Sequence, residues 1–249
     1  MPSAVPELVS VRSLYKDYGK GTGIQHALAG VDFQAGTGQV TVLLGRNGAG
    51  KSTLLKCVAG MIIPTAGEVT VCGEGNPDRI RASVGYVGES PFLDGDLTVA
   101  ESLYLELEQS CEGKGRAFWM ETGQKAIEFA GIGAFLKKKC GDLSKGYAQR
   151  VALALAICRD PAVFVMDEFS SGLDPAQAVA IRRAVKELSK TKAVVVSTHS
   201  ISEAEALDGF IYVMAGGRIS GHGRGKDLQC MTGKRTLEDA FLALSLMEN

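Results

Sequence analysis

Residues 40–55 read VTVLLGRNGAGKSTLL, and this stretch decides the fold. The apolar run 40–44 predicts a buried strand, and residues 51–60 predict a helix closed by a C-terminal glycine. Between them, residues 45–52 fit G-x-x-x-x-G-K-[ST], a loop whose glycines let backbone N–H groups surround phosphate. Because the next helix begins there and adds its partial positive charge, the stretch predicts a nucleotide phosphate site.

Two side chains of this loop carry specific chemistry. Lys51 is expected to place its charge on the β/γ-phosphates, and the Ser52 hydroxyl is expected to ligate Mg²⁺. A glycine turn that only joins strand to helix is the alternative, and a Lys-Ser pair in register argues against it. The predicted ATP-contacting residues of the loop are Gly45, Arg46, Asn47, Gly48, Ala49, Gly50, Lys51, Ser52 and Thr53.

A second apolar run, residues 163–166, ends in Asp167 and Glu168. A buried parallel strand would deliver both carboxylates to the carboxyl edge of the sheet. Asp167 is expected to hold Mg²⁺ through water, and Glu168 to polarise the attacking water. A solvated strand end is the alternative when this pattern stands alone, and the phosphate loop favours the functional interpretation.

His199 follows a third predicted strand, residues 193–197. It precedes a helix start at which Ser200 and Glu203 have capping-box spacing. A histidine at this place is compatible with a loop residue, a capped core residue or a functional group.

Composition limits the class of protein. The 249 residues include 27 Lys and Arg against 28 Asp and Glu, a net charge of −1, with 45% hydrophobic and 22% charged residues. These values are ordinary for a globular chain and argue against disorder, coiled coil and a basic nucleic-acid binder. The longest apolar run, residues 151–158, is far shorter than the roughly 18 residues of a membrane span, and residues 1–10 lack a secretory signal. Cytoplasmic residence is expected.

Short strands and amphipathic helices alternate along the chain, which predicts an α/β fold with a parallel sheet. Besides the strand that ends at residue 197 (193–197 or 194–197), further strands are expected at 69–72, 84–87 and 211–214, with a hairpin turn at Gly216-Gly217. Residues 91–160 contain helix signals instead: a capping box at Thr98 and Glu101, a helix over 119–130, and another from Ser144 to the break at 160–161. This interval is interpreted as a helical insertion. The six cysteines show no metal-ligand spacing, and buried free thiols are expected.

Residues 143–150, LSKGYAQR, resemble the signature segment of ATP-binding cassette (ABC) ATPases. The resemblance also covers the phosphate loop, Asp167-Glu168, the turn at 171–174 and His199, in the family's order. It implies a P-loop NTPase of the ABC ATPase fold, with a β subdomain and an inserted helical subdomain, that hydrolyses ATP with Mg²⁺. It further implies that Tyr18 stacks on adenine, as any aromatic ring can, and that His199 contacts the γ-phosphate.

The same resemblance implies one cassette over residues 1–249. Its core spans about 8–231, its insertion about 91–160 and its closing helix about 236–247. Two cassettes, expected to be a homodimer, would pair head to tail. The signature residues Ser144, Lys145 and Gly146 of one chain would then cover the γ-phosphate held by the other, with Asp174 at the dimer seam.

The sequence departs from the family pattern at two places. Lys145 and Tyr147 stand where the signature has its first glycine and its glutamine. Glu89 stands where the family has a glutamine that reaches Mg²⁺. A carboxylate binds Mg²⁺ more strongly than an amide but repels the γ-phosphate, so a metal-ligating role for Glu89 stays open.

With these two departures, the sequence resembles separate ATPase subunits of exporters, and residues 236–244 resemble the closing helix of those subunits. This helix is also expected to bury Leu237, Phe241 and Leu244. The expected function is ATP hydrolysis that drives a separate transmembrane permease, from the inner face of the cell membrane. One alternative is a nucleotide-gated scaffold with little turnover. Another is a soluble ABC ATPase acting on nucleic acid, which the single cassette and net charge of −1 argue against.

Overall fold

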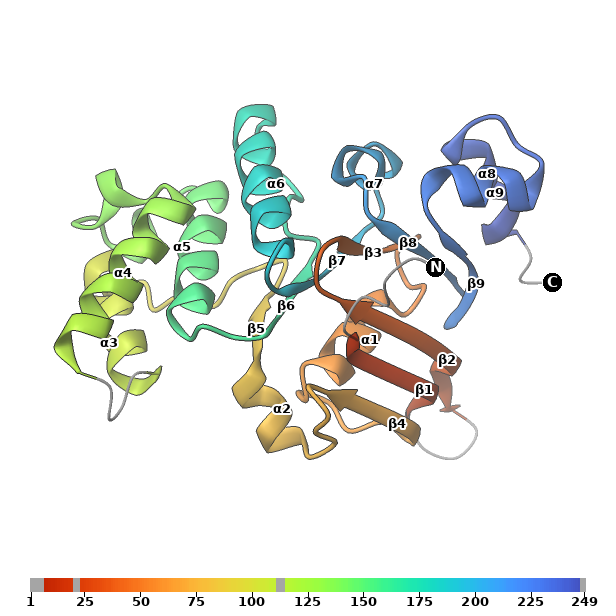
Figure 1. The fold of residues 1–249 in the computed structure, drawn as a ribbon, viewed down its shortest axis with the longest axis horizontal. Coiled ribbons are helices and arrows are strands. Elements are labelled where there is room, and N and C mark those ends of the chain that lie inside the picture. The colour runs from red at the N-terminus through yellow and green to blue at the C-terminus, as the bar shows by residue number, and fades with distance from the viewer. Residues whose placement is uncertain (1–6, 20–22, 111–114, 247–249) are drawn as a thin grey trace.

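The computed structural model describes residues 7–19, 23–110 and 115–246, and a six-stranded sheet forms its centre (Figure 1). The strand order is β5-β6-β7-β3-β8-β9, and every neighbouring pair from β5 to β8 is parallel. β9 returns antiparallel to β8 through Gly216 and Gly217, whose φ values of 50° and 73° match the predicted hairpin turn. The strands are β3 (Val40–Gly45), β5 (Val84–Val87), β6 (Val163–Asp167), β7 (Ala193–Thr198), β8 (Phe210–Ala215) and β9 (Arg218–Gly223).

A second sheet is antiparallel, with the order β2-β1-β4. It consists of β1 (Glu7–Tyr18), β2 (Gln25–Gly36) and β4 (Ala66–Val71). The sequence patterning misses β1 and β2, because several register shifts between these strands break the simple alternation of apolar and polar residues. The strand expected at 69–72 is also displaced. β4 begins three residues earlier, and Cys72 already turns away with φ at 52°.

The helices follow the predicted order. α3, α4 and α5 lie between β5 and β6 in the chain and form the group at one end of the molecule in Figure 1. The capping box before α3 is reciprocal: the Glu101 N–H donates to Thr98 Oγ1 at 3.2 Å, and the Thr98 N–H donates to Glu101 Oε2 at 2.7 Å. The helices are α1 (Lys51–Val58), α2 (Pro77–Ser83), α3 (Val99–Ser110), α4 (Arg116–Ala130), α5 (Lys145–Cys158), α6 (Pro175–Ser189), α7 (Ile201–Leu207), α8 (Gly225–Thr232) and α9 (Leu237–Ser245).

Two of these helices, α2 and α8, are not predicted from sequence. Both have fewer than nine residues, which is too few turns for a periodic pattern. The equally short α1 and α7 are predicted from the phosphate loop and from the Ser200/Glu203 spacing instead. Across the described ranges, no helix is long and apolar enough to cross a membrane.

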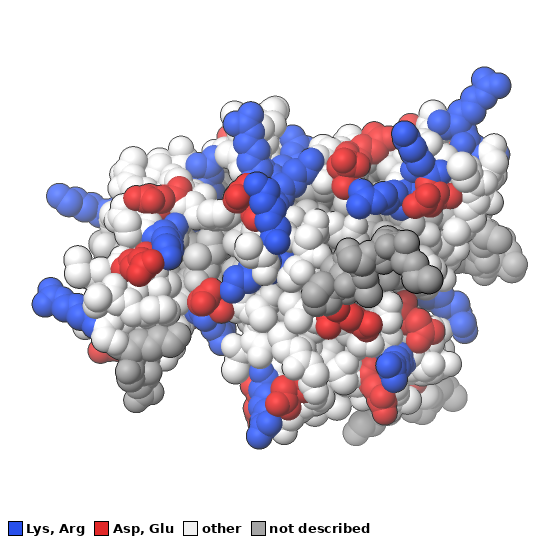
Figure 2. Space-filling view, in the orientation of Figure 1, with Lys and Arg blue, Asp and Glu red and all other residues white. Residues whose placement is uncertain are grey.

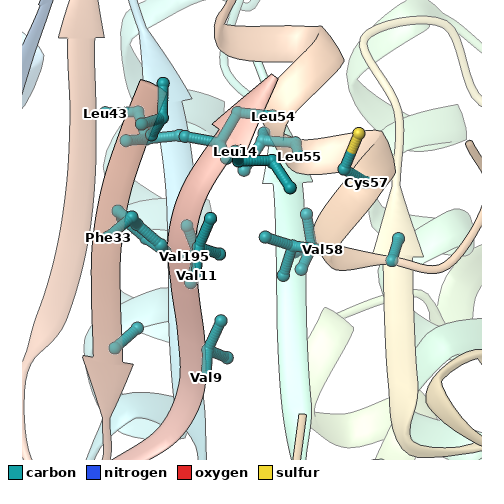
Figure 3. Close-up of a cluster of buried hydrophobic side chains, with 14 of the residues drawn as sticks. Val9, Val11, Leu14, Phe33, Leu43, Leu54, Leu55, Cys57, Val58 and Val195 are labelled. Carbon is teal, nitrogen blue, oxygen red and sulfur yellow. The ribbon is translucent and has the colours of Figure 1, made fainter. Parts of the chain in front are cut away.

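The six-stranded sheet buries both of its faces. Successive residues of a strand point to opposite sides, so Leu43 of β3 and Val195 of β7 pack toward α1 and the antiparallel sheet (Figure 3). Their neighbours Val42 and Val194 pack on the other side, in the cluster that includes residues of α6, α7 and α9. The face predicted for the closing helix is confirmed, since Leu237, Phe241 and Leu244 are buried in this second cluster.

A third apolar cluster belongs to α3, α4 and α5. Val99, Leu103, Ala126 and Val151 are buried in it, apart from the two clusters of the sheet. The three helices therefore have an apolar centre of their own. We call α3, α4 and α5 the three-helix segment.

The expectation for the cysteines is partly wrong. Cys57, Cys140 and Cys158 are buried and none of the three is in a disulfide, whereas Cys72 and Cys230 are outside disulfides but exposed. Cys72 stands at the turn after β4, and Cys230 lies on the outer side of α8, where neither packs inward. The sixth cysteine, Cys111, lies outside the described residues.

Charges of both signs are interspersed on the face shown in Figure 2, with several Lys and Arg side chains over α6. Neither positive nor negative side chains predominate on this face, which agrees with the near-neutral composition.

Leu43→Ala tests the packing between the sheet and α1. Leu43 is fully buried, so the substitution should lower the free energy of unfolding by about 2–5 kcal/mol, through lost burial and a residual cavity. Denaturant unfolding measures this change. Leu242→Ala on the half-exposed side of α9 is the control and should change stability by less than about 0.5 kcal/mol. Equal effects of the two substitutions would contradict the burial described here.

Candidate nucleotide-binding site

Three adjacent parallel strands end at one edge of the six-stranded sheet. β6, β7 and β3 are neighbours, and the pairs Asp167↔Ser197 and Leu44↔Thr198 stand at their carboxyl ends. The phosphate loop follows β3, Asp167 ends β6 with Glu168 directly after it, and His199 follows β7. Residues more than 100 positions apart in the chain therefore meet at one place, as in other open α/β sheets that bind ligands at this edge.

The loop between β3 and α1 depends on glycine. Gly50 precedes α1 with φ at 100°, and a Cβ atom there would lie 2.5 Å from the carbonyl oxygen of Ala27. A Cβ on Gly45 would lie 2.4 Å from the carbonyl oxygen of Met214. Side chains at these positions would displace backbone, so the predicted glycine loop has a direct steric reason.

Lys51 is buried at the base of this loop, with 5% of its surface exposed. Its Nζ donates to the carbonyl oxygens of Gly45 at 2.8 Å and Arg46 at 3.2 Å, and lies 3.4 Å from Glu168 Oε1. The ammonium is thus held against the loop, beside the acid that directly follows β6. An anion entering the loop would meet this charge and the first N–H groups of α1 together.

Asp167 is held by two hydroxyl groups. Ser197 Oγ donates to its Oδ1 at 2.5 Å, and the Tyr86 hydroxyl lies 3.4 Å from its Oδ2. Burial, together with the negative charge of Asp167, raises the pKa of Tyr86, which keeps that hydroxyl protonated and able to donate. Sequence reasoning missed both Ser197 and Tyr86. A serine at the end of the apolar strand β7 was the available signal.

A divalent cation fits this carboxylate. Asp167 is 5% exposed, and no Lys, Arg or His among the described residues lies within 4 Å of it. A buried carboxylate without a cationic partner is costly, and oxygen donors such as Asp167 and the Ser52 hydroxyl suit Mg²⁺.

Glu168 and His199 form the second feature of the edge. His199 Nδ1 lies 2.6 Å from Glu168 Oε2, and the other carboxylate oxygen faces Lys51. Glu168 has φ at 49°, a left-handed conformation that is rare outside glycine. Its N–H is held by the carbonyl oxygen of Ser197 at 3.2 Å and by Ser197 Oγ at 3.0 Å. The two predicted residues are therefore in contact, and Ser197 fixes both acids.

A cavity of about 510 Å³ opens in front of these groups. Tyr18 stands at its border, 39% exposed, with Lys16 Nζ 5.2 Å from the centre of its ring. Sequence reasoning missed Gln25, His26 and Ala27, because no motif marks them. The lining residues are Tyr18, Gln25, His26, Ala27, Asn47, Gly48, Gly50, Lys51, Ser52, Thr53, Glu89, Glu168, Ser171 and His199.

The signature segment does not line this cavity. Ser144 is the residue before α5, is exposed, and makes no side-chain capping bond, while Gly146 is buried close to the side chain of Gln177. Lys145 is exposed, and its Nζ lies 3.9 Å from Glu89 Oε1. The two departures from the family pattern therefore lie beside each other, and Glu89 faces Lys145 as well as the cavity.

Asp174 caps α6. Its Oδ1 accepts from the Gln177 N–H at 3.0 Å, and Pro175 is the first helical residue. The capping box expected at α7 is only half present. The Ser200 hydroxyl accepts from the Glu203 N–H at 3.3 Å, but the Glu203 carboxylate turns inward to Thr198 and Ser170.

A glycine-rich loop on a helix N-terminus, with a buried lysine and two acids at the end of another strand of the same sheet, defines a P-loop nucleotide-binding protein. Residues 28–171 match the family model described as ABC transporter. Residues 141–205 also match a model described as AAA domain, putative AbiEii toxin, Type IV TA system.

Relatives agree with the first match. Nod factor export ATP-binding protein I of Cupriavidus pinatubonensis is 33% identical over 90% of this chain and 69% of its own length. The uncharacterized ABC transporter ATP-binding protein YxlF of Bacillus subtilis is 32% identical over 89% and 72%. The chain belongs to the ATP-binding cassette family of ABC transporters, whose members are ATPases.

Solved structures extend the agreement to the fold. An ATP-binding subunit of an ABC transporter superposes with a TM-score of 0.83 at 27% identity, over 95% of this chain and 99% of that one. A dimeric cassette in a post-hydrolysis state with ADP and Pi gives 0.77 at 26%, over 87% and 98%. cbiO1 of Clostridium perfringens, part of the cbiONQ transporter complex, gives 0.78 at 26%, over 90% and 91%.

Lys51→Ala tests the phosphate site. Removal of the buried ammonium leaves the phosphates without their nearest cation, so ATP affinity should fall by at least about thirtyfold, or about 2 kcal/mol. Titration with a fluorescent ATP analogue measures the affinity. Lys56→Ala, at the other end of α1, is the control and should bind as the wild type does. Undiminished binding by Lys51→Ala would contradict the assignment.

Proposed function

We propose that this cassette is the ATP-hydrolysing subunit of an exporter and drives a separate transmembrane permease. The observation that carries the hydrolytic part of the proposal is the contact of Glu168 with His199 beside Lys51, at the cavity that the phosphate loop faces. A carboxylate next to the γ-phosphate position, oriented by a histidine, is suited to polarise water.

The proposed division of labour follows the positions of the groups. Lys51 and the N–H groups of the loop bind the phosphates, and Tyr18 stacks on the base at the cavity border. Ser52 and Asp167 would hold Mg²⁺, which when bound neutralises phosphate charge. Glu168 takes up the proton of the attacking water, and His199 holds that carboxylate and faces the γ-phosphate. Glu89, which faces Lys145 at 3.9 Å, is better suited to pair with that lysine than to ligate the metal.

A second copy of the chain would complete the site. Ser144, Lys145 and Gly146 lie outside the residues that line the cavity, although the Ser144 hydroxyl and the N-terminus of α5 suit an anion. We expect them to cover the phosphates bound by a partner cassette, with Asp174 at the seam. The dimeric ADP–Pi structure among the neighbours supports such a pairing.

The three-helix segment offers a place for the permease. A groove of about 310 Å³ runs between the residues after β5 and the side of α5, and Phe92 stands on it with 99% exposure. Leu93 and Leu155 add apolar surface, and Glu106 and Arg159 stand at its border. Because Glu89 reaches the nucleotide cavity three residues before Phe92, movement at the nucleotide could pass directly to this groove.

Export is supported by the names of the relatives. Several are named Nod factor export ATP-binding proteins, from Cupriavidus, Paraburkholderia and Rhizobium. A cassette driving a permease of this kind would be held at the cytoplasmic side through that permease.

Glu168→Gln tests the hydrolytic role. The amide keeps the shape of the side chain but cannot accept the proton of water, so kcat for ATP hydrolysis should fall by about 10²–10⁴-fold, with ATP binding retained. Phosphate release and nucleotide binding are measured on the same samples. Glu108→Gln, on the exposed side of α3, should leave both unchanged. A wild-type rate no higher than that of Glu168→Gln would instead favour the scaffold alternative.

A further inference from the structure

Glu203 is an acid on the buried side of α7. Its side chain lies with Ala204 and Leu207, which are also buried, and Glu203 itself is only 6% exposed. No Lys, Arg or His in the described part of the chain lies within 4 Å of its carboxylate. An apolar side chain could fill this position without desolvating a charge, so packing alone gives no reason for an acid here.

Two hydroxyl groups satisfy the carboxylate. Thr198 Oγ1 donates to Glu203 Oε2 at 2.6 Å, and Ser170 Oγ donates to Oε1. Hydrogen bonds to an ionised acceptor are stronger than neutral ones, and burial strengthens them further. Glu203 therefore joins Ser170, which follows β6, to Thr198, the last residue of β7; the two are 28 residues apart in sequence.

These two segments are the ones that carry the proposed catalytic groups. Ser170 stands two residues after Glu168, and Thr198 stands one residue before His199. Glu168 and His199 touch each other at 2.6 Å. The contacts form a closed ring that passes from Glu168 through Ser170, Glu203 and Thr198 to His199 and back to Glu168.

The ring of contacts helps to hold the backbone of Glu168 in an unusual conformation. The backbone of Glu168 is left-handed, with φ at 49°, and such conformations persist only where surrounding contacts hold them. Ser197 holds the N–H of Glu168, whereas Glu203 holds the chain two residues further on. Without this second anchor, the segment after Glu168 can shift relative to His199.

We infer that Glu203 is a positioning residue that fixes Glu168 against His199 by tying Ser170 to Thr198. This inference rests on the hydrolytic role proposed for Glu168. It assigns to Glu203 an effect on the rate of hydrolysis and none on ATP binding, because Glu203 does not line the nucleotide cavity.

Glu203→Ala in the full chain is the first test, with Glu205→Ala on the exposed side of the same helix as the matched control. We expect kcat to fall by about ten- to a hundredfold, as misplacement of a reacting group by about 1 Å does. The dissociation constant for ATP should change by less than about twofold, and Glu205→Ala should match the wild type.

The same substitution in the Glu168→Gln background separates positioning from general damage. If Glu203 acts through Glu168, Glu203→Ala should cost less than about twofold once Glu168 is already disabled. The loss of rate in Glu168→Gln alone tests the hydrolytic role, so a failure of that role is distinguishable from a failure of this inference.

Ser170→Ala and Thr198→Val provide a test that does not depend on removing a buried acid. Combined, they should reproduce the loss seen in Glu203→Ala, and adding Glu203→Ala to the pair should cause little further loss. A wild-type kcat in Glu203→Ala or in the combined Ser170→Ala and Thr198→Val variant would overturn the inference. It would also be overturned if Glu203→Ala lowered kcat as much in the Glu168→Gln background as in the wild type, or if Glu203→Ala lowered ATP affinity in parallel with kcat.

Discussion

The parallel pairing of β6, β7 and β3 is the constraint on which the site depends. Because the three strands run side by side in one direction, their carboxyl ends bring Asp167, Ser197 and Gly45 to a common edge. The two buried faces of the sheet, packed on α1 and on α6, α7 and α9, hold those strands in register. A shift of one residue in β7 would move Ser197 away from Asp167 and leave that buried carboxylate without its closest donor.

The parts of the site that could be predicted are those whose functional groups stand on residues adjacent in the sequence. The glycine loop with Lys51, and Asp167-Glu168 after an apolar run, are local patterns that together are typical of nucleotide sites. The parts that could not be predicted depend on contacts across strands. Ser197 and Tyr86 act on Asp167 only because of sheet register, and Glu203 has the spacing of an ordinary capping residue although its carboxylate turns inward.

The same difference between local and non-local information explains which strands of the fold could be predicted from the sequence. The strands of the parallel sheet are short apolar runs and were predicted to within two residues at either end. β1 and β2 form a bulged antiparallel pair whose register changes several times, so no simple period marks them. Their role is nevertheless direct, because the ends of this pair carry Tyr18 and Gln25 to the border of the nucleotide cavity.

A single cassette presents separately the two elements to which the proposed function assigns phosphate binding. The phosphate loop faces the cavity, and Ser144 at the start of α5 does not, which makes one chain an incomplete site in the proposed function. Sedimentation of Glu168→Gln with ATP and Mg²⁺ tests this claim most directly. We predict a dimer with ATP and a monomer with ADP, and a monomer that still binds ATP once Ser144→Arg is added. A chain that stays monomeric at saturating ATP, or that dimerises equally well with Ser144→Arg, would contradict the account.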